Sequence, residues 1–154
     1  MPSDEMLYQV VAARRAQWDN LLWQVPVLSL TAQAFLFTIS LAPDTSRIAR
    51  GIAALLSIVM SILSITLMAR HRQAELTDAH WLEDYEKQFF PNRETIHGEQ
   101  WQARRDAVNM GPGLIGCVPL VPGYKTWIIG LSAFLFAGLT VLVVTFSRPA
   151  ILSA

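Results

Sequence analysis

Three uncharged, apolar runs constrain the fold of this chain more than any other feature. They lie within residues 21–42, 50–70 and 126–147, and each is bounded by charged or turn-forming residues. As helices rising about 1.5 Å per residue they would reach roughly 28 to 33 Å, which matches the hydrocarbon core of a bilayer. The sequence therefore predicts an all-α membrane protein with three transmembrane helices.

The composition agrees with a membrane protein and argues against nucleic-acid binding and against sites that need several cysteines. Hydrophobic residues make up 53% of the chain and charged residues 16%, below the roughly 25% charged that is typical of soluble domains. The 12 basic and 12 acidic residues cancel, so the charge balance predicts no nucleic-acid partner. Cys117 is the only cysteine, which excludes an intramolecular disulfide and a thiolate metal site built from one chain.

The segments outside the runs complete the expected organisation. Residues 1–20 have apolar positions at helical spacing and predict an amphipathic N-terminal helix. The spans 21–42 and 50–70 form a transmembrane hairpin (21–70), with Pro43 and Asp44 in the turn and Thr45 or Ser46 capping the second helix. Pro26 either kinks the first helix or marks its first turn after a break. A tail, 148–154, follows the third span.

Residues 71–125 are expected to form a helical loop. The helical pattern of the second span continues toward Phe89 and stops at Pro91, and residues 93–108 have the pattern of a second short helix. Together they predict a cytoplasmic helical hairpin. The segment 109–124 is rich in glycine and proline yet apolar, so it is either an interfacial linker or a re-entrant loop.

The distribution of Lys and Arg predicts the orientation in the cell membrane. Three basic residues, Arg47, Arg50 and Arg148, lie on one side of the predicted spans. The other side holds nine, which predicts a cytoplasmic N-terminus and loop and an outside C-terminus. These nine are Arg14, Arg15, Arg70, Arg72, Lys87, Arg93, Arg104, Arg105 and Lys125.

Polar side chains recur at helical spacing on two of the spans. They form one stripe on each of the first two spans, and each stripe lines either a water-filled pore or a tight helix–helix interface. Packing is the favoured interpretation for the serines, because small residues let helices approach closely in lipid. The mid-span Gln33 is the better pore candidate. The six residues are Ser29, Gln33, Ser40, Ser57, Ser61 and Ser64.

No pattern in the chain indicates catalysis, and neither a cofactor nor a metal ion is expected. Arg50 and Arg70 mark the ends of the second span, and no ionisable residue lies inside any of the three spans, which argues against an ion-coupled transporter. His80 and Asp84 share a helical face, but the solvated-face interpretation, with pairs such as Glu83 and Lys87, is favoured over a metal or acid–base site. Aromatic residues of the loop are instead candidates for docking a cytoplasmic protein: Trp81, Tyr85, Phe89 and Trp101.

The short membrane hairpin followed by LMARHRQAELTDAHWLEDYEKQ resembles the SLATT-type and related two-span membrane effector domains of bacterial conflict systems. The resemblance is one of architecture over residues 5 to 90, and the third span departs from the two-span pattern. It implies a homo-oligomer that permeabilises the membrane when a separate partner triggers it. The sequence thus predicts a small oligomeric, pore-forming or effector subunit. The alternative is a non-conducting scaffold or regulatory subunit that docks a partner through its cytoplasmic helices.

Overall fold

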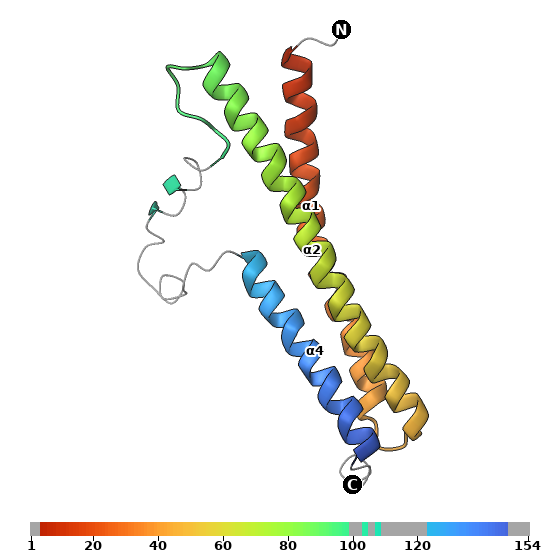
Figure 1. Ribbon diagram of the computed structural model, residues 1–154. Helices are drawn as coiled ribbons and strands as arrows, with labels where there is room; N and C mark the ends of the chain where they lie inside the picture. The colour runs from red at the N-terminus through yellow and green to blue at the C-terminus, as the bar shows by residue number, and fades with distance from the viewer. Residues whose placement is uncertain (1–3, 99–102, 105–106, 109–122, 148–154) are drawn as a thin grey trace. The chain divides into compact units, whose positions relative to one another are not determined.

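The computed structural model describes residues 4–98, 103–104, 107–108 and 123–147. Three long helices account for most of them: α1 (Asp4–Leu41), α2 (Arg47–Phe89) and α4 (Gly123–Ser147) (Figure 1). Within the described part of the chain there is no strand. Each of the three helices is long and apolar enough to cross a membrane, which confirms the predicted number of spans and indicates a multi-pass membrane protein.

The first two helices are longer than the spans they contain. The N-terminal helix expected at 1–20 and the span expected at 21–42 form one continuous helix, α1, with Pro26 buried inside it. The sequence had left open whether a break precedes this proline, and the structure has none. The second span continues to Phe89, as its helical pattern predicted. Both α1 and α2 therefore contribute to each of two compact units.

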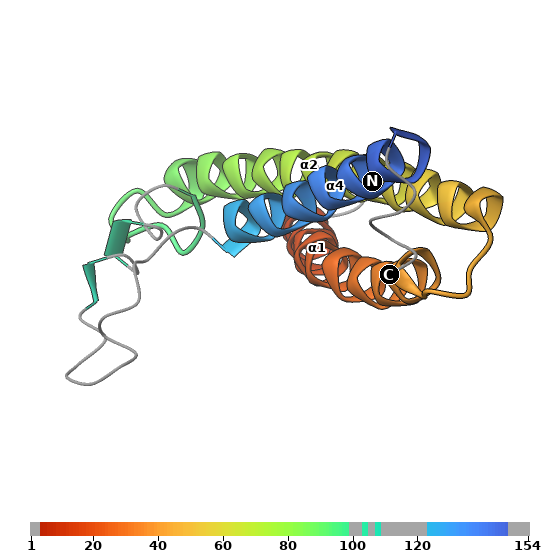
Figure 2. The ribbon, with the colours of Figure 1, turned by 90° about the horizontal axis from the view of Figure 1, so that it is seen from below.

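Unit 2 comprises residues 22–69 and 123–154, and the structure describes it as far as Ser147. Its core contains Leu22, Met68 and Leu131, one from each helix. Figure 2 shows α4 beside α2, which it contacts at a glycine. A Cβ atom placed on Gly138 would lie 3.1 Å from Ile58 and 3.4 Å from the carbonyl oxygen of Ala54. The glycine thus lets the two backbones approach closely, as is common between helices in lipid.

The helix termini of unit 2 are capped by residues at the start of α2. The Ser46 hydroxyl accepts a hydrogen bond from the Ala49 N–H at 3.3 Å, so Ser46 is the cap that the sequence proposed beside Thr45. Arg47 donates to the carbonyls of Thr145, at 2.9 Å, and Phe146, at 2.7 Å, in the last turn of α4. These are carbonyls that the helix itself leaves without partners.

Unit 1 comprises residues 1–21 and 70–122. In its described part the start of α1 lies alongside the end of α2 (Figure 1), and ion pairs described below join them. The short helix expected over 93–108 does not begin at Arg93, because residues 91–98 form turns and bends. The N–H groups of Ile96 and His97 donate to the Glu86 carboxylate and not to backbone carbonyls four residues earlier, as they would in a helix. Gly98 then adopts a positive φ of 85°, which favours glycine.

Candidate functional site

The polar stripes of the first two spans meet within unit 2. The Gln33 amide nitrogen donates to the Ser57 carbonyl oxygen at 3.0 Å and to the Ser61 hydroxyl at 2.8 Å. The Ser57 hydroxyl donates to the Gln33 amide oxygen at 2.5 Å. Gln33 is 0% exposed, and both polar atoms of its side chain have their partners on α2 of the same chain. We call this set of contacts, together with the Ser64–Ser29 bond below, the polar seam.

The polar seam extends one turn toward the start of α1. The Ser64 hydroxyl donates to the Ser29 hydroxyl at 3.1 Å, and both side chains are buried. Ser40 is also buried, but its hydroxyl donates to the carbonyl of Phe37 in its own helix, at 3.4 Å. The structure therefore brings together five of the six predicted residues across the α1–α2 interface and leaves Ser40 outside that set.

Hydroxyl groups elsewhere in the spans behave differently. Thr31, Thr38 and Thr66 are exposed, and each donates to the carbonyl four residues earlier in its own helix. That local bond satisfies a hydroxyl that faces lipid without any partner helix. The side chains of the polar seam differ from these threonines in two ways. They form hydrogen bonds between α1 and α2, and they are buried within a single chain.

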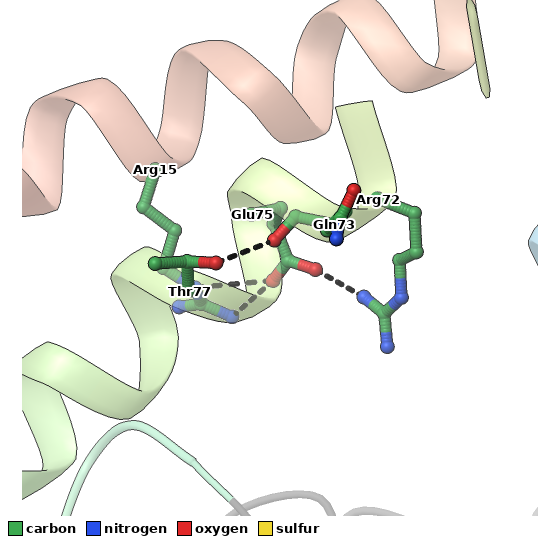
Figure 3. A network of polar contacts seen from close by, with 5 residues as sticks. All are labelled: Arg15, Arg72, Gln73, Glu75 and Thr77. Carbon is green, nitrogen blue, oxygen red and sulfur yellow. Dashed lines mark hydrogen bonds and ion pairs between the residues drawn. The ribbon is translucent and has the colours of Figure 1, made fainter. Parts of the chain in front are cut away.

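Unit 1 contains a second polar interface, built from charged groups. Arg14 of α1 forms a two-bond ion pair with Asp78 of α2, at 2.8 and 2.6 Å, and the hydrogen bond to Asp78 raises the pKa of Arg14. Arg15 donates to Glu75 at 2.9 Å, and Arg72 pairs with the other oxygen of the same carboxylate (Figure 3). Glu75 and Asp78 are 2% and 4% exposed, so both acids are buried with their partners in place.

Glu86 anchors the segment that follows α2. Its carboxylate accepts hydrogen bonds from the Tyr8 hydroxyl at 2.7 Å and from the Ile96 N–H at 2.6 Å, and its Oε1 lies 2.6 Å from Nδ1 of His97. Burial opposes ionisation of Glu86, but its donors outweigh burial and lower the pKa of the carboxyl. Burial and the neighbouring carboxylate raise the pKa of Tyr8 to about 12. At neutral pH the contact therefore joins a protonated phenol to a charged carboxylate.

The predicted docking residues form an aromatic ladder along α2. The rings of Trp81 and Tyr85 stack at 5.6 Å and those of Tyr85 and Phe89 at 4.4 Å. Tyr8 of α1 packs against Tyr85, with ring centroids 5.1 Å apart. Trp81 and Phe89 are 36% and 47% exposed, whereas Tyr85 is half-buried. The fourth predicted docking residue, Trp101, lies outside the described residues, as do residues 109–122 of the glycine- and proline-rich segment.

Sequence reasoning missed the buried charges of unit 1. It treated the polar face of this helix as solvated, and that holds for the exposed His80 and Asp84. The expected Glu83–Lys87 pair forms at 2.9 Å, but Glu83 is itself buried at 5% exposed, so the solvated interpretation is wrong for this acid. The signal for the buried acids was the spacing of Glu75, Asp78 and Glu86, which follows the same helical face as the fully buried Leu82. Without knowledge of which residues α1 places opposite this face, the spacing does not indicate burial.

Comparison of the chain with known protein families, with curated proteins and with solved structures finds no match. The resemblance to SLATT-type domains therefore stays a prediction. Among the described residues, no group of three or more His, Cys, Asp or Glu side chains is arranged to hold a metal ion. The polar seam and the exposed surface of unit 1 are therefore the features of the described residues that bear on function.

Proposed function

We propose that this protein is a membrane-anchored docking subunit that conducts no ions. In this proposal unit 2 anchors the chain in the bilayer, and the aromatic ladder of unit 1 binds a partner protein. The observation that carries the proposal is the set of hydrogen bonds around Gln33. Because the amide donates twice to α2 and accepts once from it, it needs neither water nor a second chain to satisfy it.

The pore-forming subunit that the sequence predicted first drew its support from Gln33, because a mid-span amide was hard to explain by packing alone. The bonds to Ser57 and Ser61 supply that explanation, so Gln33 no longer favours conduction. The expected homo-oligomer is not part of this proposal, since the hydroxyl stripes that motivated it are occupied within one chain. Docking is favoured because Trp81 and Phe89 leave aromatic surface exposed outside the three apolar runs of the sequence.

The docking half of the proposal is tested by site-specific photo-crosslinking in cells. A photoreactive side chain at Trp81 or at Phe89 is expected to give a discrete adduct with one protein, identified by mass spectrometry. The matched control is the same side chain at Asp84, which is exposed on the same helix but does not belong to the aromatic ladder. Absence of an adduct at both aromatic positions, or an equal adduct at all three, would contradict docking through this surface.

The non-conducting half is tested with the purified full chain in liposomes. Ion flux is expected to equal that of protein-free liposomes, both for the natural chain and for Gln33→Glu. A pore lined by residue 33 would instead conduct, and the added carboxylate would favour cations over anions. A conductance of the natural chain whose selectivity changes with Gln33→Glu would therefore contradict the non-conducting proposal and indicate a pore lined by residue 33.

We further propose that the N-terminus and residues 71–125 face the cytoplasm and that the C-terminus faces outside. Support comes from the nine-to-three distribution of basic residues across the three apolar helices. With Cys117 replaced by serine, a membrane-impermeant thiol reagent should label Ser153→Cys in intact cells. The same reagent should label Asp84→Cys only after the cells are opened. The reverse pattern would show that the orientation is inverted.

A further inference from the structure

A cavity of about 470 Å³ lies in unit 1, between the start of α1, the end of α2 and the segment that follows it. Its volume falls in the range of roughly 300 to 1,000 Å³ that is usual for ligand sites. The rings of Tyr8, Tyr85 and Phe90 contribute to its wall. Phe90 is 47% exposed and, among the described residues, stacks on no other ring. A face of this ring is therefore available to a ligand.

The charged groups of the cavity favour a cation. Three carboxylates line it, those of Glu5, Glu86 and Glu94, against one guanidinium, that of Arg93. Glu86 is ionised but already accepts several hydrogen bonds, and Glu94 pairs with Arg104. Glu5 is exposed and forms no ion pair within the part of the chain that the structure describes. It is thus the carboxylate in the wall that can accept a new partner.

Aromatic faces and carboxylates recognise the same kind of group. A guanidinium or ammonium ion is attracted to the face of an aromatic ring, and a carboxylate pairs with it directly. An anion in this cavity would meet Arg93 but also three carboxylates. The balance of charge therefore points to a basic ligand, and the volume exceeds what a single small ion needs.

We propose that this cavity binds a basic side chain of the partner protein, with its cationic group over the Phe90 ring and paired with Glu5. The inference rests on the proposed docking function and adds the chemistry of the partner: the segment that contacts unit 1 carries an arginine or a lysine. In this proposal the aromatic ladder supplies apolar contact area, and the cavity favours a positively charged side chain of the partner over a neutral or negative one.

The test uses the full-length protein in detergent micelles and a fluorescent five-residue peptide with two arginines among glycines. Its control peptide has citrulline, which keeps the shape of arginine but is neutral, in place of both arginines. The arginine peptide is expected to bind more tightly, with an affinity that falls as salt is added. Glu5→Gln and Phe90→Leu should each weaken binding about two- to fivefold.

Two control variants separate this site from the general charge of unit 1. Asp84→Asn removes an exposed acid outside the cavity, and Phe35→Leu removes an exposed ring of unit 2 that belongs neither to the cavity nor to the aromatic ladder; neither should change binding of the arginine peptide. Glu5 and Phe90 are exposed, so their variants should retain the helical circular dichroism of the natural chain.

Equal binding of the arginine and citrulline peptides would overturn the proposal. Equal weakening by Glu5→Gln and Asp84→Asn would overturn it too, because the cavity would then have no special role. Neither result affects the crosslinks at Trp81 and Phe89, so failure of the basic-side-chain site is distinguishable from failure of docking itself.

Discussion

Glu75→Ala is expected to unfold the described part of unit 1 locally while leaving the polar seam of unit 2 intact. The substitution removes a carboxylate that is 2% exposed and that pairs with both Arg15 and Arg72. Breaking a buried ion pair by removing one partner costs about 3 to 5 kcal/mol, because the remaining charge stays desolvated. We expect the lower end of this range, since the side chains of Arg15 and Arg72 remain about a quarter exposed.

Hydrogen exchange of the full chain in detergent measures this effect by segment. Amides of Arg70–Phe89 should exchange about a hundredfold faster in Glu75→Ala, while those of Gly51–Met68 should be unchanged. Asp84→Ala is the matched control, because Asp84 is exposed on the same helix and should leave exchange at its natural rate. Uniform acceleration in both segments would mean that the two units unfold together, and no acceleration would mean that Glu75 does not stabilise unit 1.

Gly138→Leu is expected to separate α4 from α2. A Cβ atom at this position would already lie 3.1 Å from Ile58 and 3.2 Å from the Ser57 hydroxyl, and three further carbon atoms have no space. Overpacking of this kind costs about 1 to 3 kcal/mol or more. Because the Ser57 hydroxyl also donates to Gln33, displacement of Ser57 should weaken the polar seam as well.

The chain provides a matched control for this substitution on the same helix. A Cβ atom on Gly130 would meet nothing within 4 Å, so Gly130→Leu adds the same atoms without a clash. Thermal unfolding in detergent should show a lower midpoint for Gly138→Leu and an unchanged or slightly higher midpoint for Gly130→Leu, since leucine also has the better helix propensity. Equal midpoints for the two variants would show that close approach at Gly138 does not hold α4 in place.

The patterns that predicted most of the architecture are local. Each apolar run is long enough to span a bilayer by itself, so the number and approximate bounds of the spans need no tertiary information. The Ser46 cap and the Glu83–Lys87 pair are similarly local, since each depends on residues three or four positions apart. The short helix expected to begin at Arg93 fails for a non-local reason, because N–H groups there donate to Glu86, ten and eleven residues earlier.

The candidate sites were also predicted in part from local spacing and in part decided by tertiary contacts. Helical spacing alone placed Ser57, Ser61 and Ser64 on one face of the second span and Ser29 and Gln33 on one face of the first, and it required these polar groups to find partners. Which partners they find depends on the register of two helices joined by a turn, and spacing within one helix does not contain that register. Only the tertiary structure decided that Gln33 bonds to α2 and not to water. It also decided that Glu75, Asp78 and Glu86 are buried, because a carboxylate can leave water only where another segment supplies its partners, here Arg15, Arg14 and Tyr8.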